Sequence, residues 1–477
     1  MSIQRFHPEV RELPKGLTPH KALERLRTQP YCLLMESAMR HPQLGRYSFL
    51  MADPIETFYL EAACTDPLSR IATSLEQYAT ENIAGLPPFQ GGWAGLLSYE
   101  LGHSYETLPQ LEPKFLSLPV AILGLYDVCL CWDHVLETGW LISQGIPETD
   151  VDSRKALARQ RADYFEKLLS ESSEDHEFDF SVEPAALPKE FVEVQSNVFT
   201  NFTQAAYHSA VESVVEFIRA GDIFQCNLSQ QLMTPQKQSA FEVYKLFSAQ
   251  NASTFAGYFD FGRAQIVSAS PERLVSLRDR KIEARPIKGT RRKTEDVLAN
   301  QHAVEELLSD PKELAENTMI VDLIRNDLSR VSIDASVQVS QFCEVEEYAT
   351  VYHLVSAIEA EIAQGRDAVD LIEAMFPGGS VTGAPKIRAM EIISELERLP
   401  RGAYCGSLGY FGFGGNADFN ILIRTATAQN GWWQIPAGGA IVVDSDPARE
   451  YAETWAKANA LLDSCKLESR GRKRVGA

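Results

Sequence analysis

Short apolar segments separated by glycine- or proline-containing turns recur along most of this chain, and many of them follow one another directly. Such runs are typical of β-strands joined as hairpins, since turn residues of this kind reverse the chain between neighbouring strands. Helical segments lie between groups of strands, but strand and helix do not alternate in the regular order of a parallel βαβ sheet. The pattern therefore predicts an α+β fold with antiparallel sheets.

The order of the elements also indicates how the chain is divided. We expect strands at residues 31–35, 46–51, 121–132, 223–232, 266–277, 405–413, 419–429 and 432–443. We expect helices at residues 208–220, 295–310, 312–328, 351–361, 386–398 and 447–462. Residues 171–190 are acidic and contain two prolines, which predicts a linker. It would join an N-terminal region, 1–170, to a larger region, 191–465, which a basic tail at 466–477 follows.

Composition excludes several classes of protein. The formal net charge of −20 argues against binding to nucleic acid or to an anionic membrane. No apolar run approaches the roughly 20 residues that span a bilayer, and the first residues do not resemble a secretory signal, so we expect a cytoplasmic protein. The eight cysteines are scattered without a CxxC pair, which predicts reduced thiols and no zinc site.

Two glycine-rich segments resemble nucleotide-binding loops but lack the features of such loops. Residues 378–386 (GGSVTGAPK) do not contain the Gly-Lys-Ser/Thr that a phosphate loop needs. Residues 409–415 (GYFGFGG) lie between two predicted strands and are expected to form a hairpin. There is also no Gly-x-Cys-x-Gly elbow of the kind that glutamine amidotransferases use, so we do not expect this chain to hydrolyse glutamine itself.

Four charged clusters remain as candidates for chemistry. They are Glu272 in SPERL, Lys288 in PIKGT, the pair Glu313 and Glu316 on one helix face, and the helical series Glu450, Glu453 and Lys457. Each cluster has an ordinary alternative, because helical glutamates most often form a solvated face and a lysine in a turn most often lies at the surface. Their co-occurrence in fixed order over more than 200 residues favours a site.

From about residue 223 to 457 the chain resembles the chorismate-utilising enzymes, which include anthranilate, isochorismate, salicylate and aminodeoxychorismate synthases. The segments that carry the resemblance are SPERL, PIKGTRR, AENTMIVDLIRNDL, FPGGSVTGAPK, GAYCGSLGYF, FNILIRTA, AGGAIV and DPAREYAETWAKA. The resemblance implies two large antiparallel β-sheets packed as a sandwich with helices on the outside. The N-terminal region resembles the leading part of component I of the anthranilate and aminodeoxychorismate members.

Two positions distinguish the branches of this family. Members that add water to the ring carry a lysine base where this sequence has Gln225. A neutral amide cannot take a proton from water, which argues against isochorismate and salicylate synthases. Anthranilate synthases typically read Pro-Ile-Ala-Gly-Thr where this chain has Lys288 in place of the alanine. The lysine resembles component I of aminodeoxychorismate synthase, an enzyme of 4-aminobenzoate and folate biosynthesis.

The chemistry explains why one residue matters. If a neutral lysine amine attacks carbon two of chorismate, ammonia can then displace it by adding at carbon four, which yields 4-amino-4-deoxychorismate. We therefore expect a covalent Lys288 adduct, with ammonia from a separate glutamine amidotransferase subunit. The alternatives are an anthranilate synthase component I, and a non-catalytic binding subunit that retains the fold.

The resemblance also implies roles for individual residues. Glu272 corresponds to the general acid and base, which requires a raised pKa. Glu316 and Glu453 correspond to Mg²⁺ ligands, with Glu313 and Glu450 as their companions. The implied substrate-binding residues are Arg424, Tyr404, Gly438, Gly439, Lys457, His353, Ser380 and Thr290. Glu36 and Ser37, in LLMES, resemble the tryptophan pocket of anthranilate synthases, although a strand end with a capping serine explains them equally well.

Overall fold

The computed structural model of the chain describes residues 6–39, 44–109, 111, 116, 118–171, 182–348 and 351–466. Part of the expected linker, residues 172–181, and the tail after Lys466 lie outside the described residues.

Two antiparallel sheets, of 13 and 10 strands, contain the strands of the described residues. The 13-stranded sheet has the order β1 (Glu9–Glu12), β8 (Thr138–Ser143), β7 (Val128–Asp133), β3 (Tyr47–Met51), β2 (Cys32–Glu36), β12 (Phe255–Asp260), β13 (Gln265–Ser270), β22 (Thr425–Gln429), β23 (Trp432–Ile441), β11 (Gln225–Pro235), β10 (Val198–Thr200) and β9 (Val192–Gln195), with β19 (Gly383–Ala384) beside β11. The 10-stranded sheet has the order β16 (Ile287–Arg292), β18 (Val351–Glu361), β15 (Lys281–Ala284), β14 (Arg273–Arg278), β21 (Ala417–Asn420), β20 (Ser407–Gly412), β5 (Gly92–Leu97), β6 (Ala121–Tyr126) and β4 (Glu56–Leu60), with β17 (Gln338–Glu347) beside β18.

Both sheets combine strands from the N-terminal and the C-terminal regions of the sequence. In the 13-stranded sheet β2 pairs with β12, and in the 10-stranded sheet β5 pairs with β20. Residues 1–170 and 191–465 are therefore interleaved in space, because neither region completes a sheet without the other.

An apolar layer lies between the two sheets. Phe49 and Phe259 from the 13-stranded sheet are buried in one cluster with Leu96, Leu408 and Tyr410 from the 10-stranded sheet. Alternation of side chains along each strand supplies these inward-facing residues, as in other packed sheets. The expected α+β fold, with two large antiparallel sheets packed as a sandwich, is confirmed.

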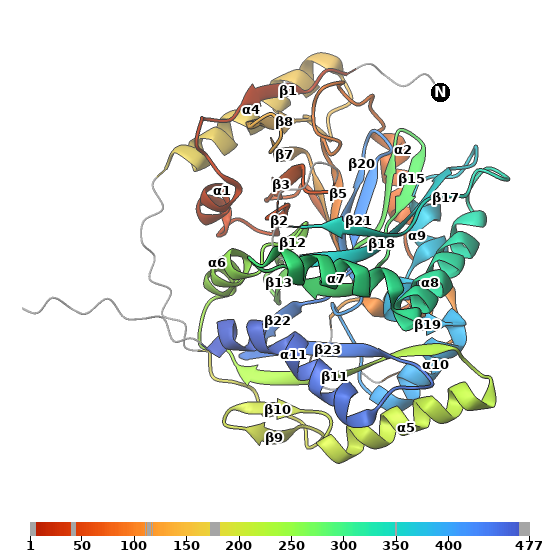
Figure 1. Cartoon of the computed structure of the whole chain (residues 1–477). Helices are drawn as coiled ribbons and strands as arrows, with labels where there is room; N and C mark the ends of the chain where they lie inside the picture. Colours follow the sequence, from red (N-terminus) through yellow and green to blue (C-terminus); the bar gives the residue numbers. More distant parts are fainter. Residues whose placement is uncertain are drawn as a thin grey trace, which may run out of the picture.

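Helices cover the outer sides of the sandwich (Figure 1). Their bounds are α1 (Pro19–Leu26), α2 (Ser69–Gln77), α3 (Gly102–Tyr105), α4 (Val151–Ser170), α5 (Gln204–Ala220), α6 (Ala240–Gln250), α7 (Val297–Ser309), α8 (Pro311–Ser329), α9 (Ala368–Met375), α10 (Lys386–Glu397) and α11 (Pro447–Lys466), with short 3₁₀ turns η1 (Tyr99–Leu101) and η2 (Gly379–Val381). Helix α8 follows α7 directly and packs against β18, while α11 packs against β23.

Four sequence predictions need correction. Residues 351–361, expected as a helix, form the strand β18. Other strands pair with both edges of β18, and most of its residues are buried one after another. Its sequence therefore lacks the alternation of apolar and polar residues that predicts a strand. The expected strands at 121–132, 266–277 and 419–429 are each divided in two, and each pair of strands lies in different sheets.

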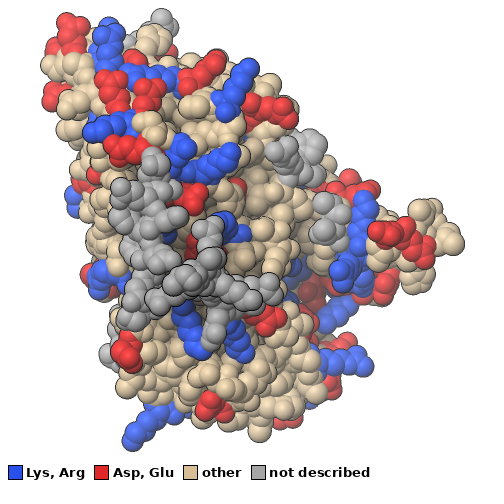
Figure 2. Space-filling model, turned by 90° about the vertical axis from the view of Figure 1, so that its left-hand side faces the viewer, with Lys and Arg blue, Asp and Glu red and all other residues tan. Residues whose placement is uncertain are grey.

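The surface carries charged side chains of both signs, as the composition of 45 basic and 65 acidic residues predicts. On the face shown in Figure 2, acidic and basic side chains are interspersed among uncharged ones. Among the described residues no helix has both the length and the hydropathy to cross a membrane.

Candidate active site

The chain passes between the two sheets at two neighbouring connections, and each carries a predicted functional residue. Glu272 lies between β13 of the 13-stranded sheet and β14 of the 10-stranded sheet. Arg424 lies in the returning connection between β21 and β22. The two connections are hydrogen bonded, since the Ile421 amide donates to the Glu272 carbonyl at 3.0 Å and the Ala269 amide donates to the Arg424 carbonyl at 3.1 Å.

A bulge in β16 positions Lys288. The pairing of β16 with β18 shifts between Lys288 and Thr290, where Gly289 has a φ of 61°. A Cβ atom at this position would lie 2.8 Å from the Leu307 side chain and 3.3 Å from the Glu313 carboxyl. Glycine at this position therefore allows the positive φ and the close approach of α7 and α8.

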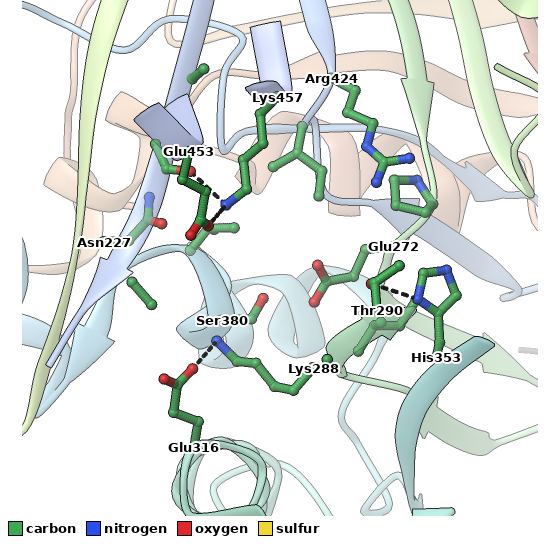
Figure 3. Close-up of a pocket in the computed structure, with 18 of the residues that line it drawn as sticks. Asn227, Glu272, Lys288, Thr290, Glu316, His353, Ser380, Arg424, Glu453 and Lys457 are labelled. Carbon is green, nitrogen blue, oxygen red and sulfur yellow. Dashed lines mark hydrogen bonds and ion pairs between the residues drawn. The ribbon is translucent and has the colours of Figure 1, made fainter. Parts of the chain in front are cut away.

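These segments enclose one cavity of about 480 Å³ (Figure 3). The two connections, β11, β16, β18 and β23 contribute to its wall, together with η2, α8 and α11. The predicted site residues that line it are Lys288, Glu272, Glu316, Glu453, Glu313, Glu450, Arg424, Tyr404, Gly438, Lys457, His353, Ser380 and Thr290. Segments that are far apart in the sequence thus meet at a single site.

The Glu272 carboxyl lies in the wall of the cavity and is only 6% exposed. Burial raises its pKa, while the Ser380 hydroxyl, the Lys288 ammonium and the Ile287 amide oppose the shift. Its Oε1 atom has no hydrogen-bond partner among the described residues, although buried polar atoms are normally paired. A protonated carboxyl with a free oxygen is suited to donate a proton to a bound ligand.

Lys288 extends into the same cavity and is 11% exposed. Its Nζ atom lies 3.7 Å from Glu316 Oε2, and Figure 3 shows both Lys288 and Glu272 pointing into the cavity. The amine therefore lies close to the buried acid and away from bulk solvent.

Two pairs of carboxylates enter the cavity from two helices. Glu313 and Glu316 lie on α8, and Glu450 and Glu453 lie on α11. Burial raises the pKa of Glu313, and the neighbouring Glu316 adds to the effect. Burial likewise raises the pKa of Glu450, with Glu453 adding to it. A divalent cation would relieve this accumulation of negative charge.

The donor atoms fit magnesium better than a softer metal. Among the described residues no three metal-binding side chains converge on one point. Magnesium needs only one or two carboxylates, because it keeps several of its water ligands. Oxygen donors without an adjacent cysteine or histidine ligand are the set that this hard ion prefers.

Arg424 presents a guanidinium group to the cavity, and among the described residues this side chain makes no hydrogen bond or ion pair. Nearby, Thr290 Oγ1 lies 2.9 Å from His353 Nδ1. Burial, and to a smaller extent the Arg424 guanidinium, lowers the pKa of His353 to about 4. The imidazole is thus neutral near pH 7, so Arg424 is the group on this side of the cavity that can hold a carboxylate.

Gly438 and Gly439 of β23 lie beside charged side chains of α11. The Lys457 ammonium donates to the Gly438 carbonyl at 2.9 Å. A Cβ atom on Gly439 would lie 3.4 Å from both the Glu450 and the Glu453 carboxyl oxygens. Gly439 therefore abuts the acidic side chains, although Gly438 is the residue of the two that lines the cavity.

Asn227 and Lys312 are among the cavity-lining residues that the sequence did not identify. Asn227 lies there, and its buried Nδ2 has no hydrogen-bond partner among the described residues. It is two residues after the fully buried Gln225 on β11, so strand alternation could have placed both on one face. Lys312 also lines the cavity, 3.9 Å from Glu316, and its i,i+4 spacing from that residue was visible in the sequence.

Glu36 and Ser37 lie elsewhere, in the walls of two other cavities of about 60 Å³ and about 440 Å³. The Glu36 carboxylate accepts from the Tyr244 hydroxyl at 2.6 Å and pairs with His20 at 2.9 Å. The Ser37 hydroxyl donates to the Tyr47 carbonyl at 2.7 Å. Both side chains thus have protein partners, and a tryptophan pocket at this place stays a prediction.

None of the eight cysteines lines the large cavity, and all are free thiols. Seven of them are buried. Burial raises the pKa of Cys226, the cysteine closest in sequence to Asn227, to about 12. Such a thiol is not available as a nucleophile, because the thiolate is the reactive form.

Relatives of known activity resemble the chain over nearly its whole length. It is 36% identical over 455 residues to the anthranilate synthase component 1 of Thermus thermophilus, covering 93% of this chain and 94% of that protein. It is also 36% identical over 449 residues to the aminodeoxychorismate synthase component 1 of Salmonella typhimurium, covering 91% and 92%. Proteins named for two different activities are thus equally similar to it.

Solved structures agree with the fold. The anthranilate synthase component I of Streptococcus pneumoniae superposes with a TM-score of 0.75 at 31% identity, covering 88% of this chain and 93% of that one. The menaquinone-specific isochorismate synthase of Escherichia coli shares the fold, with a TM-score of 0.70 at 19% identity over 97% and 95% of the two chains. The pattern of the chorismate binding enzymes matches residues 30–463, and the chain belongs to that family.

Proposed function

We propose that this chain is an aminodeoxychorismate synthase component I, which converts chorismate and ammonia into 4-amino-4-deoxychorismate and water. In the first step the neutral Lys288 amine bonds to carbon two, both conjugated ring double bonds shift, and the carbon-four hydroxyl takes a proton from Glu272 and leaves as water. In the second step ammonia bonds to carbon four, both double bonds shift back, and the lysine leaves carbon two as its amine. The enolpyruvyl ether is retained throughout.

The observation that carries this proposal is the placement of Lys288. Its amine and the Glu272 carboxyl enter the same cavity, and both side chains are largely buried. Glu272, with its raised pKa, is suited to protonate the departing hydroxyl. Arg424 is suited to hold a carboxylate of the substrate, because its guanidinium has no hydrogen bond or ion pair among the described residues.

Glu316 and Glu453 would hold a magnesium ion, with Glu313 and Glu450 beside them. When bound, the ion would offset the charge of the ring carboxylate. The remaining residues proposed to contact the substrate are Tyr404, Ser380, Thr290, His353, Gly438, Gly439 and Lys457.

Ammonia would come from a separate glutamine amidotransferase subunit. Glutamine hydrolysis of this type uses a cysteine nucleophile in a Gly-x-Cys-x-Gly elbow, and none of the eight cysteines of this chain lies in that motif. The proposal therefore treats this chain as the synthase half of a two-subunit enzyme.

The test is to incubate the purified chain with chorismate, Mg²⁺ and ammonium chloride and to identify the product by mass spectrometry. We expect 4-amino-4-deoxychorismate. Formation of anthranilate and pyruvate would instead assign the chain to the anthranilate branch. No consumption of chorismate would support a binding subunit that lacks catalytic activity.

We expect Glu316→Gln to weaken Mg²⁺ binding by at least about tenfold, because the carboxylate is a proposed ligand of an ion that takes few of them. Calorimetric titration with Mg²⁺ alone measures this effect without reference to turnover. Glu305→Gln on α7 is the matched control, since it removes the same charge from an exposed residue that does not line the cavity. Equal Mg²⁺ affinity in both variants would exclude Glu316 as a ligand.

A further inference from the structure

A buried ion pair lies behind the cavity wall. Arg401 is 1% exposed and Glu397, the last residue of α10, is 4% exposed. The guanidinium donates to both carboxylate oxygens, at 2.9 Å from Nε and 2.7 Å from Nη2. Neither residue lines the cavity. Burying two charges is costly unless their remaining hydrogen-bonding groups are satisfied, so the other contacts of the pair are informative.

The remaining contacts of Arg401 are to two segments of the cavity wall. Nη1 donates to the Val381 carbonyl at 2.9 Å, and Nη2 donates to the Asn227 carbonyl at 2.6 Å. Val381 follows Ser380, and the Ser380 hydroxyl is buried without a hydrogen-bond partner among the described residues. The Asn227 Nδ2 atom is likewise buried without a hydrogen-bond partner among the described residues. One guanidinium thus fixes the backbone beneath two unpaired polar groups of the cavity.

The pair also holds other parts of the site. The Arg401 guanidinium lies 5.8 Å from the centre of the Tyr404 ring, which lines the cavity. The Glu397 carboxylate accepts from the Ser229 amide at 2.7 Å and from the Ser229 hydroxyl at 2.9 Å. Ser229 in turn pairs with Gly438 on β23.

The N-terminal region joins this network through one carboxylate. Glu100 accepts from the Arg401 amide at 2.7 Å and from the Gly402 amide at 3.1 Å. The segment that carries Arg401 is therefore held both by its own side chain and by a residue from the other part of the sequence.

We propose that Arg401 and Glu397 are positioning residues, which set the placement of Asn227, Ser380 and Tyr404 for substrate binding without contacting the substrate. The planar fork of arginine is required, because a single lysine nitrogen cannot reach the two carboxylate oxygens and the two carbonyls together. This inference uses the proposed function only in taking the cavity as the chorismate site.

The test is Arg401→Lys, assayed by the consumption of chorismate with Mg²⁺ and ammonium so that the identity of the product does not matter. We expect the KM for chorismate to rise on the order of tenfold while kcat changes much less, the pattern of lost ground-state binding. The matched control is Arg161→Lys. Arg161 forms a comparable fork with Asp127 and the Asp53 carbonyl and does not line the cavity.

Both lysine variants should lower the melting temperature, but only Arg401→Lys should change KM. A wild-type KM in Arg401→Lys, with a melting temperature lowered as in the control, would show that the pair serves stability alone. If Arg401→Lys does not fold, Ser229→Ala decides the question, because it removes a single contact to Glu397. An unchanged KM in that variant overturns the inference, whereas failure of the wild-type chain to consume chorismate overturns the proposed function instead.

Discussion

Lys288→Ala is expected to lower the formation of 4-amino-4-deoxychorismate on the order of 10³-fold or more, because it removes the proposed covalent nucleophile. Without the lysine, amination at carbon four would need a direct displacement there. Ammonia could then attack carbon two instead, so residual amination should appear at that carbon. The measurement is the rate of each product, resolved by liquid chromatography and mass spectrometry.

Lys312→Ala provides the matched control for this variant. Lys312 lines the same cavity, and its ammonium lies 3.9 Å from Glu316, comparable with the 3.7 Å between Lys288 and that residue. Both substitutions therefore remove one positive charge from the same carboxylate. We expect Lys312→Ala to retain activity within about tenfold, as for a modest change in local charge. Equal losses in the two variants would mean that Lys288 acts through its charge and not as a nucleophile.

The covalent step can also be observed directly. When the wild-type chain is mixed with chorismate and Mg²⁺ but no ammonia, the second displacement has no nucleophile and the adduct should accumulate. Peptide mass spectrometry after an acid quench should locate it on Lys288 and find none in Lys288→Ala. An unmodified Lys288 in an enzyme that forms 4-amino-4-deoxychorismate would rule out the proposed intermediate.

The sequence predicted the members of the site better than it predicted the path of the chain through it. The motif residues Glu272, Lys288 and Arg424 all line the cavity. However, the strands expected at 266–277 and 419–429 continue through positions where the chain changes sheets. The segments on either side of each crossing have a similar apolar composition, so periodicity does not mark the crossing, although Pro271 at the first one is a residue that rarely lies inside a paired strand.

Contacts between segments that are distant in the sequence were not predictable. Arg401 and Asn227 are 174 residues apart in sequence, and their contact exists only once α10 has packed against β11. Many residues that line the cavity can therefore be found from local motifs, whereas the residues that support them depend on the assembled fold.

Glu272→Gln should lower kcat by roughly 10²–10⁴-fold, the usual contribution of a general acid or base. The amide keeps the shape of the side chain but cannot protonate the departing hydroxyl. Glu272→Asp, which retains an acid on a shorter chain, should recover part of the activity. Glu359→Gln, at an exposed position of β18 outside the cavity, is the control for loss of a carboxylate.

The raised pKa of Glu272 makes two further results part of this prediction. The acid must be protonated to act, so wild-type kcat should fall as pH rises through its pKa. A carboxyl whose pKa is higher in the folded state than in the unfolded state stabilises the fold at low pH and loses that contribution as pH rises. Above that pKa, Glu272→Gln should therefore melt at a higher temperature than the wild type while it turns over far less substrate. A variant that is both less active and less stable would indicate that the Glu272 carboxylate has a structural role. Removal of a charge that is buried and reactive should instead lower the activity and raise the melting temperature.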